Sequence, residues 1–250
     1  MFAHVRASTS GALAEINCHP WSYHSLMWMH NGTSLRLPLL LSRHPLYIPM
    51  LDNSYKSRRT RLIIGAIGGF DKIKRRLMMS LRDEYFLNVQ GNTDSEWAFA
   101  VFLNELANLG CNPSDQKPGG FGHAVLRQAM TNTISNINKW CKEVGEQEPS
   151  LLNFALTDGE AVIATRYVSS PTEEPASLFF RYEFRYGNKV DGSSGTSFHQ
   201  YAPGHFRMER RDKGQDIVLV ASEPLTFERA DWVTVPSNCI IPCGNLGFLL

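Results

Sequence analysis

The sequence has no hydrophobic run long enough to cross a membrane. None of the apolar stretches in its 250 residues reaches the roughly 18 to 20 residues that a membrane-spanning helix needs. The first residues also lack the basic segment, apolar stretch and cleavage site of a secretory leader. We therefore expect a soluble, cytoplasmic protein with no membrane partner.

The sequence also lacks an excess of charge of either sign. Its 25 lysine and arginine residues nearly balance 24 acidic residues, which leaves a formal net charge of +1. Two basic clusters, YKSRRTRL at residues 55–62 and FDKIKRRL at residues 70–77, offer few aromatic side chains for stacking on bases. Under a near-neutral net charge such clusters are typical of a solvated surface, so we expect no nucleic-acid partner.

Cysteine is too sparse and scattered to form a disulfide framework or a zinc site. The five cysteines are an odd number, and only Cys239 and Cys243 are close enough in the sequence to act as a pair of metal ligands. No second pair completes a four-ligand site. We expect reduced thiols, no bound metal and no cofactor.

Internal repeats and linkers rich in proline, glycine or serine are absent as well. Without a linker between two separate apolar regions, residues 1–250 are expected to form a single domain. The short apolar run at residues 26–29 predicts a strand that enters a tight turn from His30 to Gly32.

Three helices are indicated by apolar residues at helical spacing. The first is expected over residues 70–81. The second is expected to begin at Thr93 or Asp94, because Glu96 occupies the position of a capping-box acid relative to Thr93. The third is expected near residues 125–141.

The second half of the chain is rich in β-branched and aromatic residues. LLNFALTDGEAVIATRYV, residues 151–168, predicts two strands joined by a two-residue turn at Asp158 and Gly159. DIVLVASEPL and DWVTVPSN add two further β-rich segments. Helices in the middle, with strands before and after them, predict an α+β layered fold.

Four short motifs occur in a fixed order: HVRASTSG at 4–11, NCHPW at 17–21, MHNG at 29–32 and GNTDSEW at 91–97. Together they resemble the class II glutamine amidotransferases, a family of N-terminal-nucleophile hydrolases. Longer stretches, such as GHFRMERRDKGQDIVLVASEPLTFERADWVTVP at 204–236, are similar to the fungal amidotransferase subunit of glutathione degradation. The bacterial γ-glutamyl hydrolase of the ergothioneine pathway is a more distant relative.

The resemblance implies an αββα four-layer sandwich, here without its first strands. It implies hydrolysis of γ-glutamyl amide bonds, with glutathione or glutamine as the small-molecule substrate. It also implies a peptidase-like partner subunit in a glutathione-degradation complex.

A γ-glutamyl group carries an α-carboxylate and an α-ammonium, so its site needs a fixed cation and a fixed anion. Arginine can hold a carboxylate with two parallel hydrogen bonds, and the resemblance assigns this role to Arg6 and the ammonium to Asp94. From the residues alone, Arg6 is equally explained by a surface ion pair and Asp94 by a helix N-cap.

The resemblance assigns the oxyanion hole to Asn31 and Gly32, an amide side chain beside a flexible backbone N–H. Asn-Gly is also a common turn pair, which is the simpler explanation of the residues alone. Thr9 and His19 match positions that line the family's substrate pocket, although His19 before Pro20 is also typical of a structural histidine.

The chain departs from the family pattern in several places. The family's nucleophile is an N-terminal cysteine, whereas Phe2 follows Met1 here. Residues 33–66 and 181–192 are interpreted as insertions and 239–250 as a divergent tail, either from an incorrect gene model or as surface loops.

We therefore expect an incomplete domain that is inactive as written. The alternative is a non-catalytic subunit that binds a γ-glutamyl ligand or only the partner.

Overall fold

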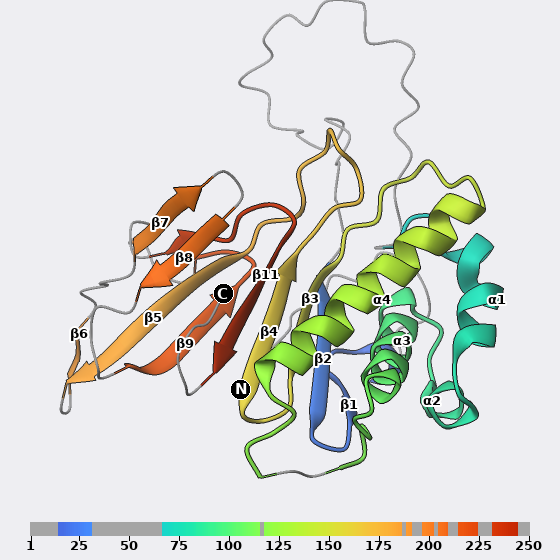
Figure 1. Cartoon of the computed structure of the whole chain (residues 1–250), viewed down its shortest axis with the longest axis horizontal. Coiled ribbons are helices and arrows are strands. Elements are labelled where there is room, and N and C mark those ends of the chain that lie inside the picture. Colours follow the sequence, from blue (N-terminus) through green and yellow to red (C-terminus); the bar gives the residue numbers. More distant parts are fainter. Residues whose placement is uncertain are drawn as a thin grey trace, which may run out of the picture.

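The computed structural model describes residues 15–31, 67–115, 118–186, 189–191, 197–202, 205–209, 215–224 and 232–244. Figure 1 shows their helices and strands coloured along the sequence. Every pairing between these strands is antiparallel. Because all four α-helices lie together in the sequence between β2 and β3, the described part has the α+β organisation that the sequence predicts.

A five-stranded sheet in the order β1-β2-β3-β4-β11 forms the middle of the molecule. Its strands are β1 (Trp21–Tyr23), β2 (Leu26–Asn31), β3 (Asn153–Thr157), β4 (Ala161–Arg166) and β11 (Cys239–Gly244). The pairing of β11 with β4 runs from Cys239 opposite Arg166 to Gly244 opposite Ala161. Segments from the two ends of the described chain therefore share one sheet.

Helices cover one face of this sheet, on the right in Figure 1. They are α1 (Phe70–Ser80), α2 (Asp83–Asn88), α3 (Asp94–Asn108) and α4 (His123–Glu143), and a short 3-10 helix, η1 (Glu15–Asn17), precedes β1. Residues of α3 and α4 pack with β2, β3 and β4 in the largest hydrophobic cluster of the described chain. None of these helices is both long and apolar enough to span a membrane.

Burial alternates along β2, as expected for a strand with one face against a core. Leu26 and Trp28 are fully buried, whereas Met27 and Met29 are only half-buried. The Trp28 ring lies with its centroid 5.6 Å from the Phe99 and Phe102 rings of α3, and 4.4 Å from the Phe154 ring of β3. Aromatic packing therefore holds β2 against α3.

A second sheet packs on the other face of β4 and β11. It is built around β5 (Phe179–Tyr186), which pairs with β6 (Lys189–Asp191), β9 (Gln215–Ala221) and β10 (Val233–Thr234). A separate two-stranded sheet consists of β7 (Ser197–Ala202) and β8 (His205–Glu209). Ala164 of β4, Phe180 next to the start of β5 and Ile241 of β11 share one buried cluster. Ala161 and Ile163 point instead into the helical core, so β4 contributes to both interiors.

The described residues thus form three layers, a helical layer, a sheet and a second sheet. These layers agree with the α+β prediction and with part of the predicted αββα sandwich. A fourth, helical layer beyond β5 is not seen among the described residues, so the complete four-layer arrangement stays a prediction.

The three predicted helices are confirmed, and two predicted turns differ. Helix α1 ends at Ser80, one residue before the predicted boundary. Strand β2 continues through Asn31, so the chain does not turn at His30. In the β3–β4 hairpin only Gly159 has a positive φ, of 95°. The backbone N–H of Asp158 donates to the Ala161 carbonyl instead, which places Gly159 first in the two-residue loop.

Two of the three segments interpreted as departures from the family contain paired strands. Residues 181–186 continue β5. They pair with β9 as far as Phe184, with a register shift after Glu183, and from Phe184 to Tyr186 with β6. Residues 239–244 form β11. Residues 33–66 lie outside the described residues. Whether any of these segments is an insertion stays a prediction.

Candidate functional site

Asn31 is the last residue of β2 and lies opposite Asn153 of β3. The alternation along the strand places His30 on the helical side and Asn31 on the other face, where Asn31 is half-buried. The end of β2 is held by its pairing with β3, because β1 pairs only with Leu26 to Trp28. Asn31 is therefore a strand residue with a defined position, although Gly32 lies outside the described residues.

Asp94 is the first residue of α3 and not its N-cap. The N-cap is Thr93, whose hydroxyl accepts a hydrogen bond from the Glu96 N–H at 3.3 Å. The explanation of Asp94 as a capping residue is therefore wrong. Its Oδ2 atom instead accepts the N–H of Ile67 at 2.9 Å, in the segment that leads into α1. A carboxylate in the first helical turn is also stabilised by the helix dipole.

A chain of hydrogen bonds joins β2 to the start of α3. Nδ1 of His30 lies 2.8 Å from Oγ of Ser95, and Oγ lies 3.2 Å from Oδ1 of Asp94. On the other side of the ring, Nε2 lies 2.9 Å from the carbonyl oxygen of Leu151. His30 and Ser95 are both buried. These hydrogen bonds connect Asp94 to His30, the residue before Asn31, through the protein interior.

Glu96 anchors the loop before α3. Its carboxylate accepts the backbone N–H groups of Gln90 at 2.9 Å and Gly91 at 2.8 Å. A Cβ atom at Gly91 would lie 2.5 Å from Oε2 of Glu96 and 2.6 Å from Oδ1 of Asn17, so a larger residue here would displace these two side chains. The predicted capping position of Glu96 is confirmed, but its carboxylate binds this loop.

A cavity of about 260 Å³ lies beside this loop, between η1, β1 and α3. Polar groups of Ser22, Gln90 and Glu96 lie in its wall together with Cys18. His19 is not among its lining residues. The His19 ring instead packs edge-on against Trp21, with a centroid distance of 4.2 Å.

The described structure therefore connects Asp94 through Ser95 to His30, the neighbour of Asn31, whereas Asn31 itself lies on the other face of the strand. Among the described residues, the other candidate, His19, takes no part in these hydrogen bonds. Arg6 and Thr9 lie outside the described residues. His19 lies in the loop between η1 and β1. Sequence reasoning missed Ser95, although it lies inside the GNTDSEW motif beside Asp94.

The cysteines are all free thiols. Burial raises the pKa of Cys141 and Cys239, and raises that of Cys243 to about 12. These three thiols are therefore protonated near neutral pH and are poor nucleophiles there. Within the described ranges, no three histidine, cysteine or acidic side chains are grouped as metal ligands.

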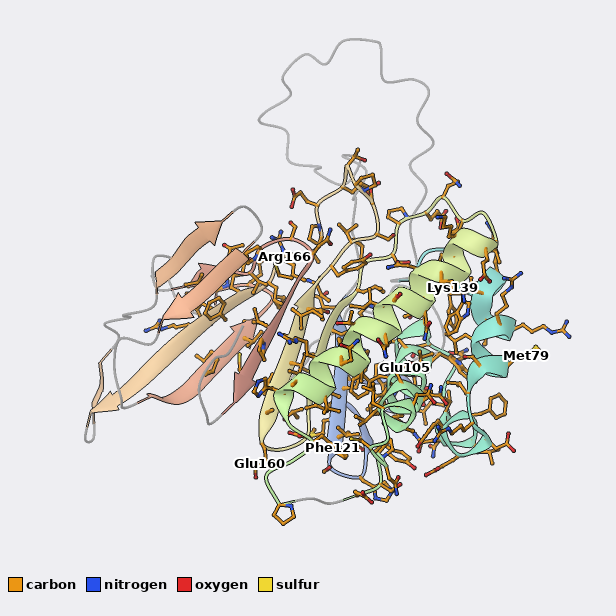
Figure 2. The ribbon with its side chains drawn as sticks, in the orientation of Figure 1. Met79, Glu105, Phe121, Lys139, Glu160 and Arg166 are labelled. Atoms are coloured by element: carbon orange, nitrogen blue, oxygen red, sulfur yellow. The ribbon has the colours of Figure 1, made fainter. Side chains whose placement is uncertain are left out.

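At the β3–β4 hairpin, the polar contacts of Asp158 hold the backbone in place. Asp158 accepts the N–H of Phe121 at 2.7 Å and that of Ala161 at 2.8 Å. Figure 2 shows Phe121 and Glu160 together at this hairpin, and Arg166 near the second sheet. Arg166 donates to backbone carbonyls of Ala176 and Val235, which ties the loops of the two sheets together.

The fold is shared with a solved class II domain. The structure of a glutamine aminotransferase class-II domain protein from Silicibacter pomeroyi matches 93% of this chain and 69% of its own, with a TM-score of 0.51 and 20% sequence identity. At this identity the likeness concerns the fold. No protein-family model matches the chain.

In sequence, the chain is more similar to a curated yeast protein than to this solved structure. The chain is 45% identical over 254 residues to the probable glutamine amidotransferase DUG3 of Saccharomyces cerevisiae, an alignment that covers 100% of this chain and 58% of the relative. The chain thus spans little more than half the length of this relative. The resemblance to class II glutamine amidotransferases that the four motifs indicate is confirmed.

Proposed function

We propose that this domain is part of an enzyme that hydrolyses γ-glutamyl amide bonds in the manner of a class II glutamine amidotransferase. The observation that carries the proposal is the 45% identity to a probable glutamine amidotransferase across the whole chain. The positions of Asn31 at a strand end and Asp94 at a helix start support it, because both are held by neighbouring elements.

Substrate recognition is assigned to residues that bind the two charged groups on the α-carbon of the γ-glutamyl group. Arg6 binds the α-carboxylate with two parallel hydrogen bonds, and Thr9 and His19 line the pocket around it. Asp94 binds the α-ammonium. Its orientation by the Ile67 N–H and the Ser95 hydroxyl supports this role, since a carboxylate held in one orientation binds an ammonium group with less loss of entropy.

The chemical step is attack of a thiolate sulfur on the γ-carbonyl carbon. The electron pair of the carbonyl moves to its oxygen, where the Asn31 amide and the Gly32 N–H donate hydrogen bonds to the oxyanion. Collapse of this intermediate breaks the C–N bond and releases the amine, which takes up a proton. Water then hydrolyses the thioester to glutamate and the thiol. The resemblance assigns the thiol to an N-terminal cysteine, and the raised pKa values argue against Cys141, Cys239 and Cys243.

We further propose glutathione as the substrate and a peptidase-like subunit as the partner. Both rest on the similarity to the fungal amidotransferase subunit of glutathione degradation. The expected cytoplasmic location stays a prediction on the same basis.

The test combines binding and turnover. Isothermal titration of the purified chain with glutathione, L-glutamine and cysteinylglycine reports binding, and glutamate release reports hydrolysis. We expect saturable binding of the two γ-glutamyl compounds and none of cysteinylglycine, which lacks the γ-glutamyl group. Absence of binding for both γ-glutamyl compounds would overturn the proposal.

The rate of glutamate release distinguishes an active hydrolase from the alternative, a non-catalytic subunit that only binds the γ-glutamyl ligand. Binding with glutamate release at the level of a no-enzyme sample agrees with the prediction that the chain as written is inactive. Release above that level contradicts the prediction of inactivity and favours the enzyme. Binding of glutathione tenfold tighter than that of glutamine would support the glutathione assignment, and the reverse order would count against it.

A further inference from the structure

We propose that Ser95 and His30 are positioning residues that orient Asp94 toward the α-ammonium group of the γ-glutamyl substrate. The inference rests on the proposed function, because it concerns the same carboxylate. It follows from the hydrogen bonds that join His30, Ser95 and Asp94 inside the protein.

The first step is the orientation of the His30 ring. The Leu151 carbonyl can only accept a hydrogen bond, so Nε2 of His30, at 2.9 Å, carries a proton and donates it. Nδ1 is therefore the nitrogen that faces Ser95. A tilted ring contact adds a second constraint, since the His30 ring centroid lies 4.6 Å from that of Phe154. The imidazole is held in one orientation from β3 and from the segment before it.

The second step is the Ser95 hydroxyl, which stands between two acceptors when His30 is neutral. Its single proton then goes either to Nδ1, at 2.8 Å, or to Oδ1 of Asp94, at 3.2 Å. When both ring nitrogens are protonated, Nδ1–H donates to Oγ and Oγ–H donates to Asp94. In both states His30 sets the position of the Ser95 oxygen beside the Asp94 carboxylate.

The third step is the carboxylate itself, which is held by both of its oxygens. Oδ1 contacts Ser95, and Oδ2 accepts the Ile67 N–H at 2.9 Å. The Ile67 segment is fixed in turn, because the Gly68 N–H donates to Oγ of Ser150 at 3.1 Å. A Cβ atom at Gly68 would lie 2.0 Å from the Glu148 carbonyl oxygen, so this segment also packs closely against the chain before β3.

Loss of the Ser95 hydroxyl removes one of these two contacts. The Ile67 N–H still holds Oδ2, but the contact that orients Oδ1 is lost. The α-ammonium group of the substrate loses a preorganised partner, whereas its α-carboxylate and its γ-amide group keep theirs. The effect should therefore depend on whether the ligand has an α-ammonium group.

The test compares L-glutamine with glutaramate, which is glutamine without its α-amino group. Dissociation constants are measured by isothermal titration on the whole chain and on three variants, Asp94→Asn, Ser95→Ala and His30→Gln. Thr133→Val is the matched control, because Thr133 is a buried residue of α4 whose hydroxyl donates to the Ala129 carbonyl at 2.8 Å, within its own helix.

We expect Ser95→Ala and His30→Gln to weaken glutamine binding about three- to tenfold, the range of one neutral hydrogen bond. Asp94→Asn should weaken it about ten- to a hundredfold, because a charged partner is lost. Glutaramate binding should change less than about twofold in each case. Adding Ser95→Ala to Asp94→Asn should have no further effect, since both act through one contact.

Two measurements keep the result independent of folding defects. Thermal melting verifies that each variant is folded. If Ser95→Ala does not fold, Ser95→Cys is used in its place, because the cysteine thiol has a similar size but is a weak hydrogen-bond donor. The ¹⁵N resonances of the His30 ring provide a direct signature. Nε2 should be protonated, and Ser95→Ala should shift the Nδ1 resonance while Thr133→Val leaves it unchanged.

The outcomes separate the inference from the proposed function. If Asp94→Asn weakens glutamine binding but Ser95→Ala and His30→Gln do not, the inference is wrong and the proposed function stands. Equal weakening of glutamine and glutaramate by Ser95→Ala would also overturn the inference, because it indicates a general structural role. If the unaltered chain binds neither ligand, the proposed function fails and the inference fails with it.

Discussion

At the residue scale, Glu146 organises the connection between α4 and β3. Its carboxylate accepts the N–H groups of Gln147 at 2.8 Å and Glu148 at 2.9 Å, and pairs with Lys72 of α1 at 2.8 Å. The hydrogen bond from Glu148, followed by that from Lys72, lowers the pKa of Glu146 to about 2. This connection leads to Leu151, whose carbonyl accepts the bond from His30.

The lowered pKa predicts a pH-dependent contribution to stability. The folded-state pKa lies below the ordinary glutamate value of about 4.3, so the contribution is complete above that value and is lost as the pH falls through about 2. Glu146→Gln should cost about 1 kcal/mol at pH 7, allowing for solvent around Lys72, and progressively less toward pH 2. Urea denaturation at pH 7 and pH 3 measures the difference.

Glu143→Gln is the control for this prediction. Glu143 pairs with Arg76 at the surface, where both side chains are more than one-third exposed. Exposed pairs of this kind contribute at most about 0.5 to 1 kcal/mol. Equal effects of the two substitutions at both pH values would contradict the special role of Glu146.

Arg6 carries a second prediction at this scale. Arg6→Ala should weaken L-glutamine binding about ten- to a hundredfold, because a charge-assisted hydrogen bond to the α-carboxylate is lost. The affinity of Arg6→Lys for L-glutamine should lie between those of the unaltered protein and Arg6→Ala, since lysine keeps the charge but not the two parallel hydrogen bonds. L-glutaminamide, which has no α-carboxylate, should bind all three proteins alike in titration calorimetry. A similar loss for both ligands would show that Arg6 acts elsewhere.

At the scale of elements, the start of α3 combines a structural cap with a candidate binding group. Thr93 caps the helix, Asp94 contacts Ile67, and Glu96 holds the preceding loop. Three neighbouring polar residues thus have three different partners. The motif TDSE is therefore explained partly by helix formation and partly by the site that it supports.

Replacing the cap should affect stability without removing the binding group. Thr93→Ala should lower the free energy of unfolding by about 1 kcal/mol, because the Glu96 N–H loses its acceptor at the end of a buried helix. Thr93→Ser should retain most of the stability, since its hydroxyl occupies the same position. Denaturant unfolding of the two variants tests the assignment. Equal losses would show that the threonine methyl group, and not the cap, is important.

At the scale of the whole molecule, β4 and β11 link two hydrophobic interiors. The larger interior lies between the main sheet and the helices, and the smaller one lies between the two sheets. Phe180 is fully buried in the smaller cluster with Ala164 and Ile241. The second sheet is therefore attached to the first by apolar packing.

Phe180→Ala should destabilise the protein by about 3 to 5 kcal/mol, because it leaves a cavity between the sheets. Leu87→Ala is the control, since Leu87 is 75% exposed and should change stability by less than about 0.5 kcal/mol. Hydrogen exchange should show the largest loss of protection in β5 and β9 for Phe180→Ala. Protection lost first in α3 and α4 would contradict the proposed division into two interiors.

Local sequence patterns were sufficient for most helix positions and for the family. The boundaries of α1 and α3 follow from helical spacing and a capping signal, which act over a few residues. The turn expected at His30 was wrong because the Asn-Gly signal is local, whereas pairing with β3 extends β2 to Asn31. Tertiary pairing overrode the local preference there.

By itself, the sequence determined that this protein is an α+β relative of class II glutamine amidotransferases, with Asn31 and Asp94 as candidates. Only the tertiary structure decided which side chains hold Asp94. His30 and Ser95 are 65 positions apart, and His30 and Leu151 are 121 apart. Such contacts depend on how β2, α3 and β3 pack, and no periodicity within a single segment specifies them.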